Sequence, residues 1–260
     1  MIIGVDHILI AVGNLEPAME AYRRLGFQVM RGGEHPRMGT HNALVPLSDG
    51  AYLELIGVRN YELARQFPNT RLVADALKRP ERLATFALDT NDIDADLAGM
   101  RNRGLGMGDP AEGERRRPDG KRVVWLTAHP ADPDLPFLIE DVTPRPERVP
   151  LPTEGLGARA FVAELQVATR SLPDASRIWK NFLGKIPPDD YEFILERSAV
   201  RLIGVEGRPT GLHSVTLGVD DLQGLAQDYR ERGIHFKQSE ARLELDQVDT
   251  AGAWLNLIQK

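Results

Sequence analysis

Two residues that can bind metals or move protons stand at matching places in the first and last strand-like runs of residues 1–58. His7 lies near the start of the β-branched run 4–12, and Glu54 lies inside the run 52–58. Because side chains alternate between the two faces of a strand, both residues can face the open side of a sheet whose other side is covered by a helix. A histidine and a glutamate that converge in a concave, mostly apolar sheet are plausible ligands for one divalent ion.

The elements that must position this pair form a βαβββ unit. Asn14 is an N-cap signal with Pro17 in the first turn, apolar residues follow at helical spacing to Leu25, and Gly26 closes the helix. Short strands are expected at residues 27–30, 41–47 and 52–58. His7 and Glu54 therefore belong to the first and last strands of one unit.

This unit opens with Asp6-His7-Ile8 and closes with Tyr52-Leu53-Glu54-Leu55-Ile56. It resembles the vicinal oxygen chelate superfamily, which includes glyoxalase I, extradiol dioxygenases and antibiotic-resistance binding proteins. The loop of residues 32–42 is similar to that of the subgroup called glyoxalase-like domain proteins. The resemblance is clearest over residues 1–142 and continues more weakly to the C-terminus.

The βαβββ pattern recurs along the chain. A two-helix insertion at about residues 60–78, with a break at Pro68-Asn69-Thr70, precedes a second unit at residues 83–142. Third and fourth units open near residues 160 and 211, after a Pro/Gly-rich linker at residues 144–158. The sequence therefore predicts the α+β class, with four βαβββ modules in two paired-module, incomplete-barrel domains. Their predicted ranges are 1–143 and 159–260.

The resemblance implies metal ligands on the first and last strands of each module. For the concave inner surface of the first domain, called the first cup, it points to His7, Glu54, Thr85 and either Ile139 or Glu140. The last choice is open because a one-residue slip exchanges the faces of strand 137–142. Glu140 is preferred, since a carboxylate under the covering helix would be costly to bury. The predicted ligands are His7, Glu54 and Glu140, for Mn, Fe, Ni or Zn. Thr85 departs from the usual His or Glu.

The same mapping gives the second cup Glu164, Arg201, His213 and Asn256. Arginine cannot bind a cation, and in a shared cup it would pair with Glu164, so this cup is predicted to be metal-free. Extradiol dioxygenases hold iron on two histidines and a glutamate in their second domain, and only His213 remains here. This argues against a ring-cleaving dioxygenase.

Further site residues come from the loop over the first cup and from aromatic side chains. His35 and His41 could bind a substrate anion or move protons if they face inward, because histidine titrates near neutral pH. The alternative is that the polar loop residues hydrogen-bond the loop into shape, that aromatic residues fill the cup floor, and that His7 is structural. The predicted catalytic residues are Glu54, His35 and His41, and the predicted substrate-binding residues are Thr40, Asn42, Tyr52, Trp125 and Phe137.

Composition sets the remaining expectations. The chain has 260 residues, a net charge of −6 and no cysteine, so neither a nucleic-acid footprint nor thiol chemistry is expected. The basic run Arg115-Arg116-Arg117 is diluted by Glu112 and Glu114, which favours a solvated loop, with a grip for an anionic substrate as the alternative. No membrane helix or signal peptide is evident, and a cytoplasmic protein is expected. A homodimer is possible because open sheet edges invite pairing.

Two functions follow from these patterns. The first is a divalent-metal-assisted lyase, isomerase or hydrolase that acts on a small oxygenated substrate in the N-terminal cup, where the ion acts as a Lewis acid and a carboxylate moves a proton. The second is a metal-free protein that binds or sequesters a small, partly apolar molecule, as resistance proteins of the superfamily do. Thr85 and the ligand losses in the second cup favour the second function.

Overall fold

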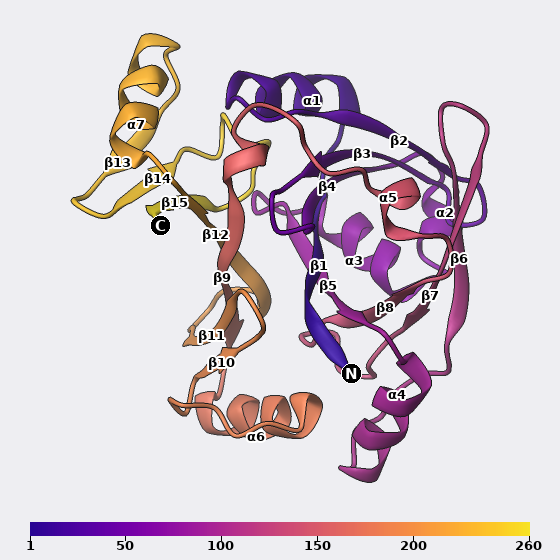
Figure 1. Ribbon diagram of the computed structural model, residues 1–260. Coiled ribbons are helices and arrows are strands. Elements are labelled where there is room, and N and C mark those ends of the chain that lie inside the picture. The colour runs from indigo at the N-terminus through magenta and orange to yellow at the C-terminus, as the bar shows by residue number, and fades with distance from the viewer.

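The structure, a computed structural model, describes all 260 residues and arranges the strands in two sheets (Figure 1). The first sheet closes into a barrel in the order β1-β4-β3-β2-β6-β7-β8-β5. Its strands are β1 (Ile2–Ala11), β2 (Met30–His35), β3 (Thr40–Pro46), β4 (Tyr52–Val58), β5 (Leu83–Thr90), β6 (Ala111–Arg116), β7 (Arg122–Ala128) and β8 (Phe137–Asp141).

The second sheet is open and has the order β10-β11-β9-β12-β15-β14-β13. Its strands are β9 (Phe161–Thr169), β10 (Glu192–Ile194), β11 (Ala199–Gly204), β12 (Gly211–Val219), β13 (Phe236–Gln238), β14 (Arg242–Leu245) and β15 (Leu255–Gln259). The helices are α1 (Leu15–Arg24), α2 (Tyr61–Ala64), α3 (Pro68–Ala76), α4 (Ile93–Asn102), α5 (Arg145–Arg148), the 3-10 helix η1 (Gly157–Arg159), α6 (Leu172–Leu183) and α7 (Leu222–Glu231). None of them combines the length and apolar character needed to cross a membrane.

The predicted α+β class with paired modules is confirmed, with one change at the first sheet. Its two modules meet at β2 and β6, where Glu34 pairs with Arg116, so this barrel is closed where the sequence predicted an incomplete one. Within the first module β1 runs parallel to β4 and places Leu9 opposite Glu54. The strands that carry His7 and Glu54 are therefore neighbours.

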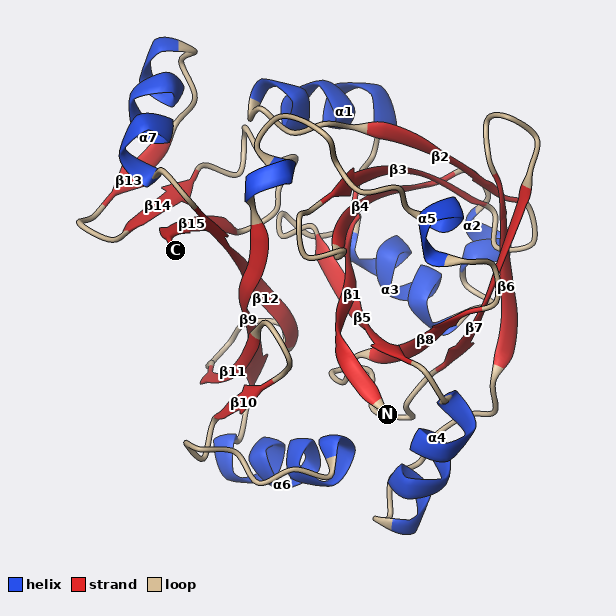
Figure 2. Cartoon of the chain, in the orientation of Figure 1, coloured by secondary structure: helices blue, strands red, loops and turns tan.

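A shared hydrophobic core joins the barrel to the second sheet. The outward faces of β1 and β5 supply Ile8 and Phe86, and β12 supplies Leu217 from the other side. Phe86 also stacks on Trp179 of α6, with ring centroids 6.3 Å apart. Figure 2 shows the helices α1, α4, α6 and α7 at the margins of this double layer. Because one face of the barrel wall is used for this contact, the barrel interior is left for the site.

Helices α2 and α3 lie within the range predicted for a two-helix insertion, and α3 lies across the barrel interior (Figures 1 and 2). Val73 and Ala76 of α3 pack with Leu9, Ile56 and other apolar residues of the inner wall. The helix therefore fills one side of the cup and leaves a smaller cavity beside it.

Two predicted loops are ordered differently. The strand expected at residues 27–30 begins instead at Met30 and runs to His35, so most of the loop predicted at 32–42 is a β2–β3 hairpin. Gly39 turns this hairpin with φ of +65°, a conformation that favours glycine. The segment predicted as a linker contains α5, whose Arg148 is buried against the barrel.

Candidate active site in the barrel cavity

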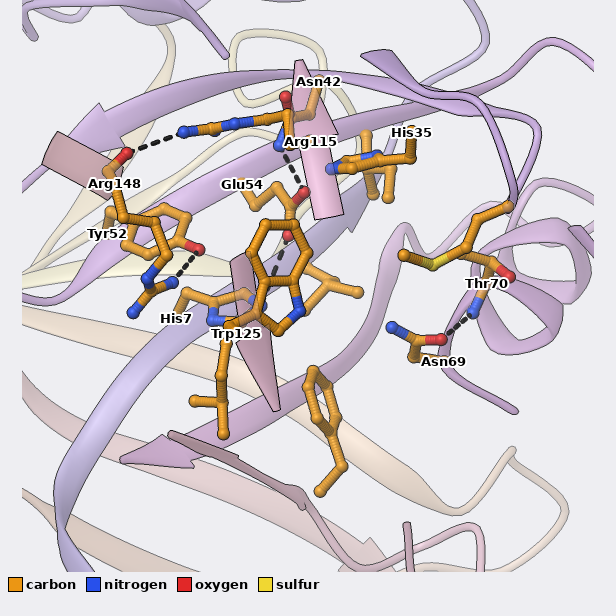
Figure 3. A pocket seen from close by; sticks show the side chains of 15 residues that line it. His7, His35, Asn42, Tyr52, Glu54, Asn69, Thr70, Arg115, Trp125 and Arg148 are labelled. Atoms are coloured by element: carbon orange, nitrogen blue, oxygen red, sulfur yellow. Dashed lines mark hydrogen bonds and ion pairs between the residues drawn. The ribbon is translucent and has the colours of Figure 1, made fainter. Parts of the chain in front are cut away.

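The barrel encloses a small, mixed polar and apolar cavity with a free volume of about 30 Å³, room for one or two water molecules (Figure 3). Side chains from seven strands, the β2–β3 turn and helices α3 and α5 converge on it. The lining residues are His7, Leu9, His35, Met38, Asn42, Tyr52, Glu54, Ile56, Asn69, Thr70, Arg115, Trp125, Phe137, Ile139 and Arg148.

His7 and Glu54 face each other in this cavity. His7 Nε2 lies 3.3 Å from Glu54 Oε2, and both side chains are almost completely buried. Asn42 Nδ2 donates a hydrogen bond of 2.6 Å to the other carboxylate oxygen, Glu54 Oε1. The His7 ring is held between two aromatic rings, since it stacks on Tyr52 at 4.8 Å and meets the edge of Phe137 at 5.6 Å. These contacts hold the His7 ring and the Glu54 carboxylate in fixed orientations.

Asp6 sets which nitrogen of His7 carries the proton. Its Oδ1 accepts a hydrogen bond of 2.5 Å from His7 Nδ1, which leaves Nε2 directed at Glu54. Asp6 is buried at a β-bulge of β1, a distortion that can redirect a side chain. Arg148 Nη2 donates to its other oxygen at 2.6 Å, and Arg145 pairs with the same oxygen. Burial raises the pKa of Asp6, but these two guanidinium groups more than offset it, so the pKa lies well below its usual range.

His35 lines the cavity as a neutral side chain. Its Nδ1 and the Thr40 hydroxyl lie 2.9 Å apart, and its ring meets Trp125 edge-on at 6.0 Å. Burial lowers the pKa of His35 to about 4, with a smaller opposing effect from the charge of Glu54. His35 is therefore uncharged near neutral pH. Thr40 supports His35 and is not itself among the lining residues.

Arg115 reaches the cavity from β6 and is only 3% exposed. Its Nη2 donates a hydrogen bond of 2.7 Å to the Arg148 carbonyl oxygen, and its buried Nε has no partner. Burial lowers its pKa, although a guanidinium stays protonated in proteins. Arg115 thus lies inside the barrel, and the solvated loop predicted for it is wrong. The neighbouring Arg116 is exposed, as that prediction requires.

The structure does not bring Glu140 to the cavity. Ile139 faces inward from β8 instead, and Glu140 Oε2 accepts a hydrogen bond of 2.7 Å from the backbone N–H of Ile93 at the start of α4. The sequence argument assumed that a carboxylate on this side of the strand would be costly to bury. Here the N–H of Ile93 and the positive end of the α4 dipole stabilise the Glu140 carboxylate, so that cost is removed. Of the three predicted ligands, His7 and Glu54 line the cavity and Glu140 does not. No group of three or more His, Asp and Glu side chains has a metal-binding arrangement in the structure.

Two other predicted residues lie elsewhere. His41 alternates with the inward Asn42 on β3, is not among the lining residues, and its ring lies against Gly57. Thr85 lines a separate, larger pocket of about 620 Å³ beside α3, together with His129. Asn69 and Phe137 line both pockets, so this outer pocket adjoins the inner cavity. Of the remaining predicted residues, Tyr52, Asn42, Trp125 and Phe137 do line the cavity.

In the second sheet the predicted pairing of Arg201 with Glu164 is confirmed at 3.0 Å between Nε and Oε2. Glu192 also accepts from Arg201, at 2.6 Å. His213 stacks on Trp254, with ring centroids 5.9 Å apart. The charged groups of this surface therefore satisfy one another.

Asp6, Arg148 and the α3 residues Asn69 and Thr70 were not predicted as site residues, and Arg115 was considered only as the less favoured alternative, a grip for an anionic substrate. Arg115 could have been found by the two-residue period of β6, because Gly113 and Arg115 are buried while Glu112 and Arg116 are exposed. Arg148 had no such signal, since its position depends on a turn of helix within a proline-rich segment.

Comparison with known proteins places this geometry in a family. The family model described as "Glyoxalase-like domain" matches residues 5–183. No curated protein matches the chain in sequence. A hypothetical protein from Staphylococcus aureus has a similar structure, with a TM-score of 0.72, 17% identity and 100% of both chains covered.

Two further solved structures share the fold. A mutant of 4-hydroxymandelate synthase from Streptomyces coelicolor has a TM-score of 0.65 at 11% identity, covering 100% of this chain and 93% of that one. A catechol 2,3-dioxygenase has a TM-score of 0.61 at 12% identity, covering 100% and 88%. At such identities the likeness concerns the fold alone. The family model matches more than half of the chain, so the chain belongs to the glyoxalase-like domain family.

Proposed function

We propose that the barrel cavity is the active site of a lyase, isomerase or hydrolase that acts on a small oxygenated substrate with the assistance of a divalent metal. The observation that carries this proposal is the facing pair of His7 Nε2 and Glu54 Oε2, 3.3 Å apart in a buried cavity. Asp6 also supports the proposal, because its carboxylate accepts a hydrogen bond from the other imidazole nitrogen, Nδ1.

A positive charge is needed between His7 Nε2 and Glu54 Oε2. When Asp6 accepts from Nδ1, a neutral His7 presents the lone pair of Nε2 to a carboxylate oxygen, and two electron-rich atoms then face each other in a site of low dielectric. Either a proton or a metal ion resolves that repulsion. A carboxylate behind a histidine is also the usual support of a histidine that binds a metal.

The donor set fits a divalent metal as a site with two protein ligands, His7 and Glu54. Ile139 and Thr85 occupy the strand positions from which further ligands would come, so other ligands would be water or substrate oxygens. The metal would supply Lewis acidity, which stabilises enolate-like charge on a substrate oxygen.

The protein's own groups have separable roles in this proposal. Glu54 is the only carboxylate that lines the cavity, so it is the group that can accept a proton from a carbon next to a carbonyl group, and it can do so only while its Oε2 does not hold the metal. Asn42 holds one oxygen of this carboxylate and thereby orients the other. His35, neutral at pH 7, can exchange a hydrogen bond with substrate without adding charge. Leu9, Ile56 and the aromatic rings exclude water.

Metal content measured by elemental mass spectrometry tests the proposal. Untagged wild-type protein is compared with the double variant His7→Ala, Glu54→Ala after incubation with manganese, iron, nickel or zinc. Glu140→Ala is the matched control, because it removes a carboxylate that the sequence favours as a ligand and the structure places outside the cavity. Near-stoichiometric metal in wild type and control, lost in the double variant, is expected. Equal metal in all three proteins would overturn the assignment.

The second candidate function is metal-free binding of a small molecule. Its supporting observation is the outer pocket of about 620 Å³ that adjoins the cavity and offers more room than the cavity itself. In that case a proton lies between His7 and Glu54. The double variant would then bind the same ligand with little change in affinity, since apolar walls would dominate.

A further inference from the structure

Two arginines line the cavity, and only one of them is neutralised by carboxylates. Arg148 is 2% exposed and contacts both Asp6 and Asp141. Arg115 is 3% exposed, and no carboxylate lies within 4.0 Å of its guanidinium. Its single hydrogen bond goes to a neutral carbonyl oxygen, and its Nε has no partner. A buried guanidinium without an anion is unfavourable unless something else supplies the negative charge.

Glu54 does not fill this role. It is the one carboxylate of the cavity, but Asn42 occupies one of its oxygens and His7 faces the other. Figure 3 shows Arg115 on the side of the cavity where Asn42 and Arg148 lie, with its dashed contact running to Arg148 and none to Glu54. The cavity therefore has a cationic side, at Arg115, and a separate reactive side, at His7 and Glu54.

We propose that Arg115 binds a carboxylate group of the substrate, so that the small oxygenated molecule processed here is an organic acid. This inference rests on the proposed function for its reaction, but the binding that it describes does not require the metal. A guanidinium is suited to a planar carboxylate, because its N–H groups form a fork that matches two oxygens. The small free volume of the cavity, about 30 Å³, favours a carboxylate over a bulkier phosphate or sulfate.

The outer pocket offers a route for such an acid. It shares Asn69 and Phe137 with the inner cavity, and it has about 620 Å³ of space. A substrate can therefore place its carboxylate near Arg115 while the part remote from the reacting carbon stays beside α3.

The test uses metal-free, full-length protein labelled with nitrogen-15 and titrated with sodium acetate. The Nε–H signal of Arg115, assigned by its loss in Arg115→Lys, is followed by NMR at constant ionic strength. Acetamide serves as the neutral molecule of the same shape. A saturable shift with acetate and none with acetamide is expected. Equal responses to the two molecules, or no response to acetate, would overturn the proposal.

Variants separate this result from the fate of the metal site. Arg115→Gln lacks the reporting Nε–H, so it is followed through the indole N–H signal of Trp125, another lining residue, and is expected to bind acetate at least about tenfold more weakly, as for the loss of a charge-assisted hydrogen bond. Arg116→Gln removes the same charge from the next residue of β6, which is exposed, and should bind acetate as wild type does. His7→Ala, Glu54→Ala should lose metal yet keep the acetate response. If Arg115→Gln binds acetate like wild type, the carboxylate assignment is wrong even where the metal assignment holds.

Discussion

Substitution by methionine should lower the free energy of unfolding at Arg148 but not at Arg115, although both arginines are buried in the cavity. Arg148→Met leaves Asp6, which is fully buried, with Arg145 as its remaining cation, and it also leaves Asp141 without its closer partner. Breaking a buried ion pair from one side typically costs about 3 to 5 kcal/mol, because the other charge stays buried. The hydrogen bond of 3.0 Å from Arg148 to the Tyr52 hydroxyl is lost as well.

Arg115→Met removes a charge that has no carboxylate partner. The loss is one hydrogen bond, to the Arg148 carbonyl oxygen, which contributes about 0.5 to 1.5 kcal/mol. Relief from burying an uncompensated guanidinium acts in the other direction and is of at least similar size. The free energy of unfolding should therefore stay within about 1 kcal/mol of wild type or rise, so the two variants should differ by about 3 kcal/mol or more.

Urea denaturation at pH 7, with the slope compared among the three proteins, measures this difference. Thermal unfolding should separate the variants by roughly 6 to 12 °C, at about 2 to 4 °C per kcal/mol for a chain of this size. If Arg115→Met destabilises the protein as much as Arg148→Met does, the charge of Arg115 is compensated within the fold. The reasoning that assigns it to a ligand would then fail.

Three further changes test individual contacts. Burial, with the charge of Asp6, raises the pKa of Asp89 to about 6. The stabilising contribution of the protonated Asp89 is therefore lost as pH rises from about 4 to 6. Asp89→Asn should add about 1 to 3 kcal/mol to the free energy of unfolding at pH 7 but nothing at pH 3.5. Burial holds the pKa of His35 near 4, below its value in the unfolded chain. The free energy of unfolding therefore falls as pH drops from about 6.5 to 4. In urea titrations, the fall between pH 7 and pH 4.5 should be smaller in His35→Asn than in wild type by about 2 to 3 kcal/mol. Glu140→Gln should lower thermal stability by about 1 kcal/mol through the loss of charge at the start of α4, and an unchanged melting temperature would contradict the contact with Ile93.

Most of the fold followed from local signals. The Asn14 cap, the helical spacing to Leu25 and the positive φ of Gly26 define α1 as expected, and the side-chain alternation of β1 and β4 correctly placed His7 and Glu54 on one face. These features depend on short stretches of sequence, where capping and a period of two are physically decisive. The insertion was also predictable, although its position inside the barrel was not.

The errors arise where contacts distant in sequence decide the outcome. Strand 137–141 can place either Ile139 or Glu140 inward, and the choice depends on whether another element can satisfy the carboxylate. The backbone of Ile93, distant in sequence, does so. Arg115 was expected in solvent because acidic residues flank it, yet Glu112 and Glu114 pair with Arg122 on the outer face of the same hairpin. Without that strand pairing, the inward direction of Arg115 cannot be read from its neighbours.

Anomalous diffraction from crystals soaked in zinc chloride tests the central claim most directly. We expect one strong peak in the barrel, about 2.0 to 2.2 Å from both His7 Nε2 and Glu54 Oε2. Crystals of Glu140→Ala should show the same peak, and crystals of His7→Ala, Glu54→Ala should not. A barrel without a peak, in which His7 and Glu54 still face each other, would show that a proton and not a metal lies between them.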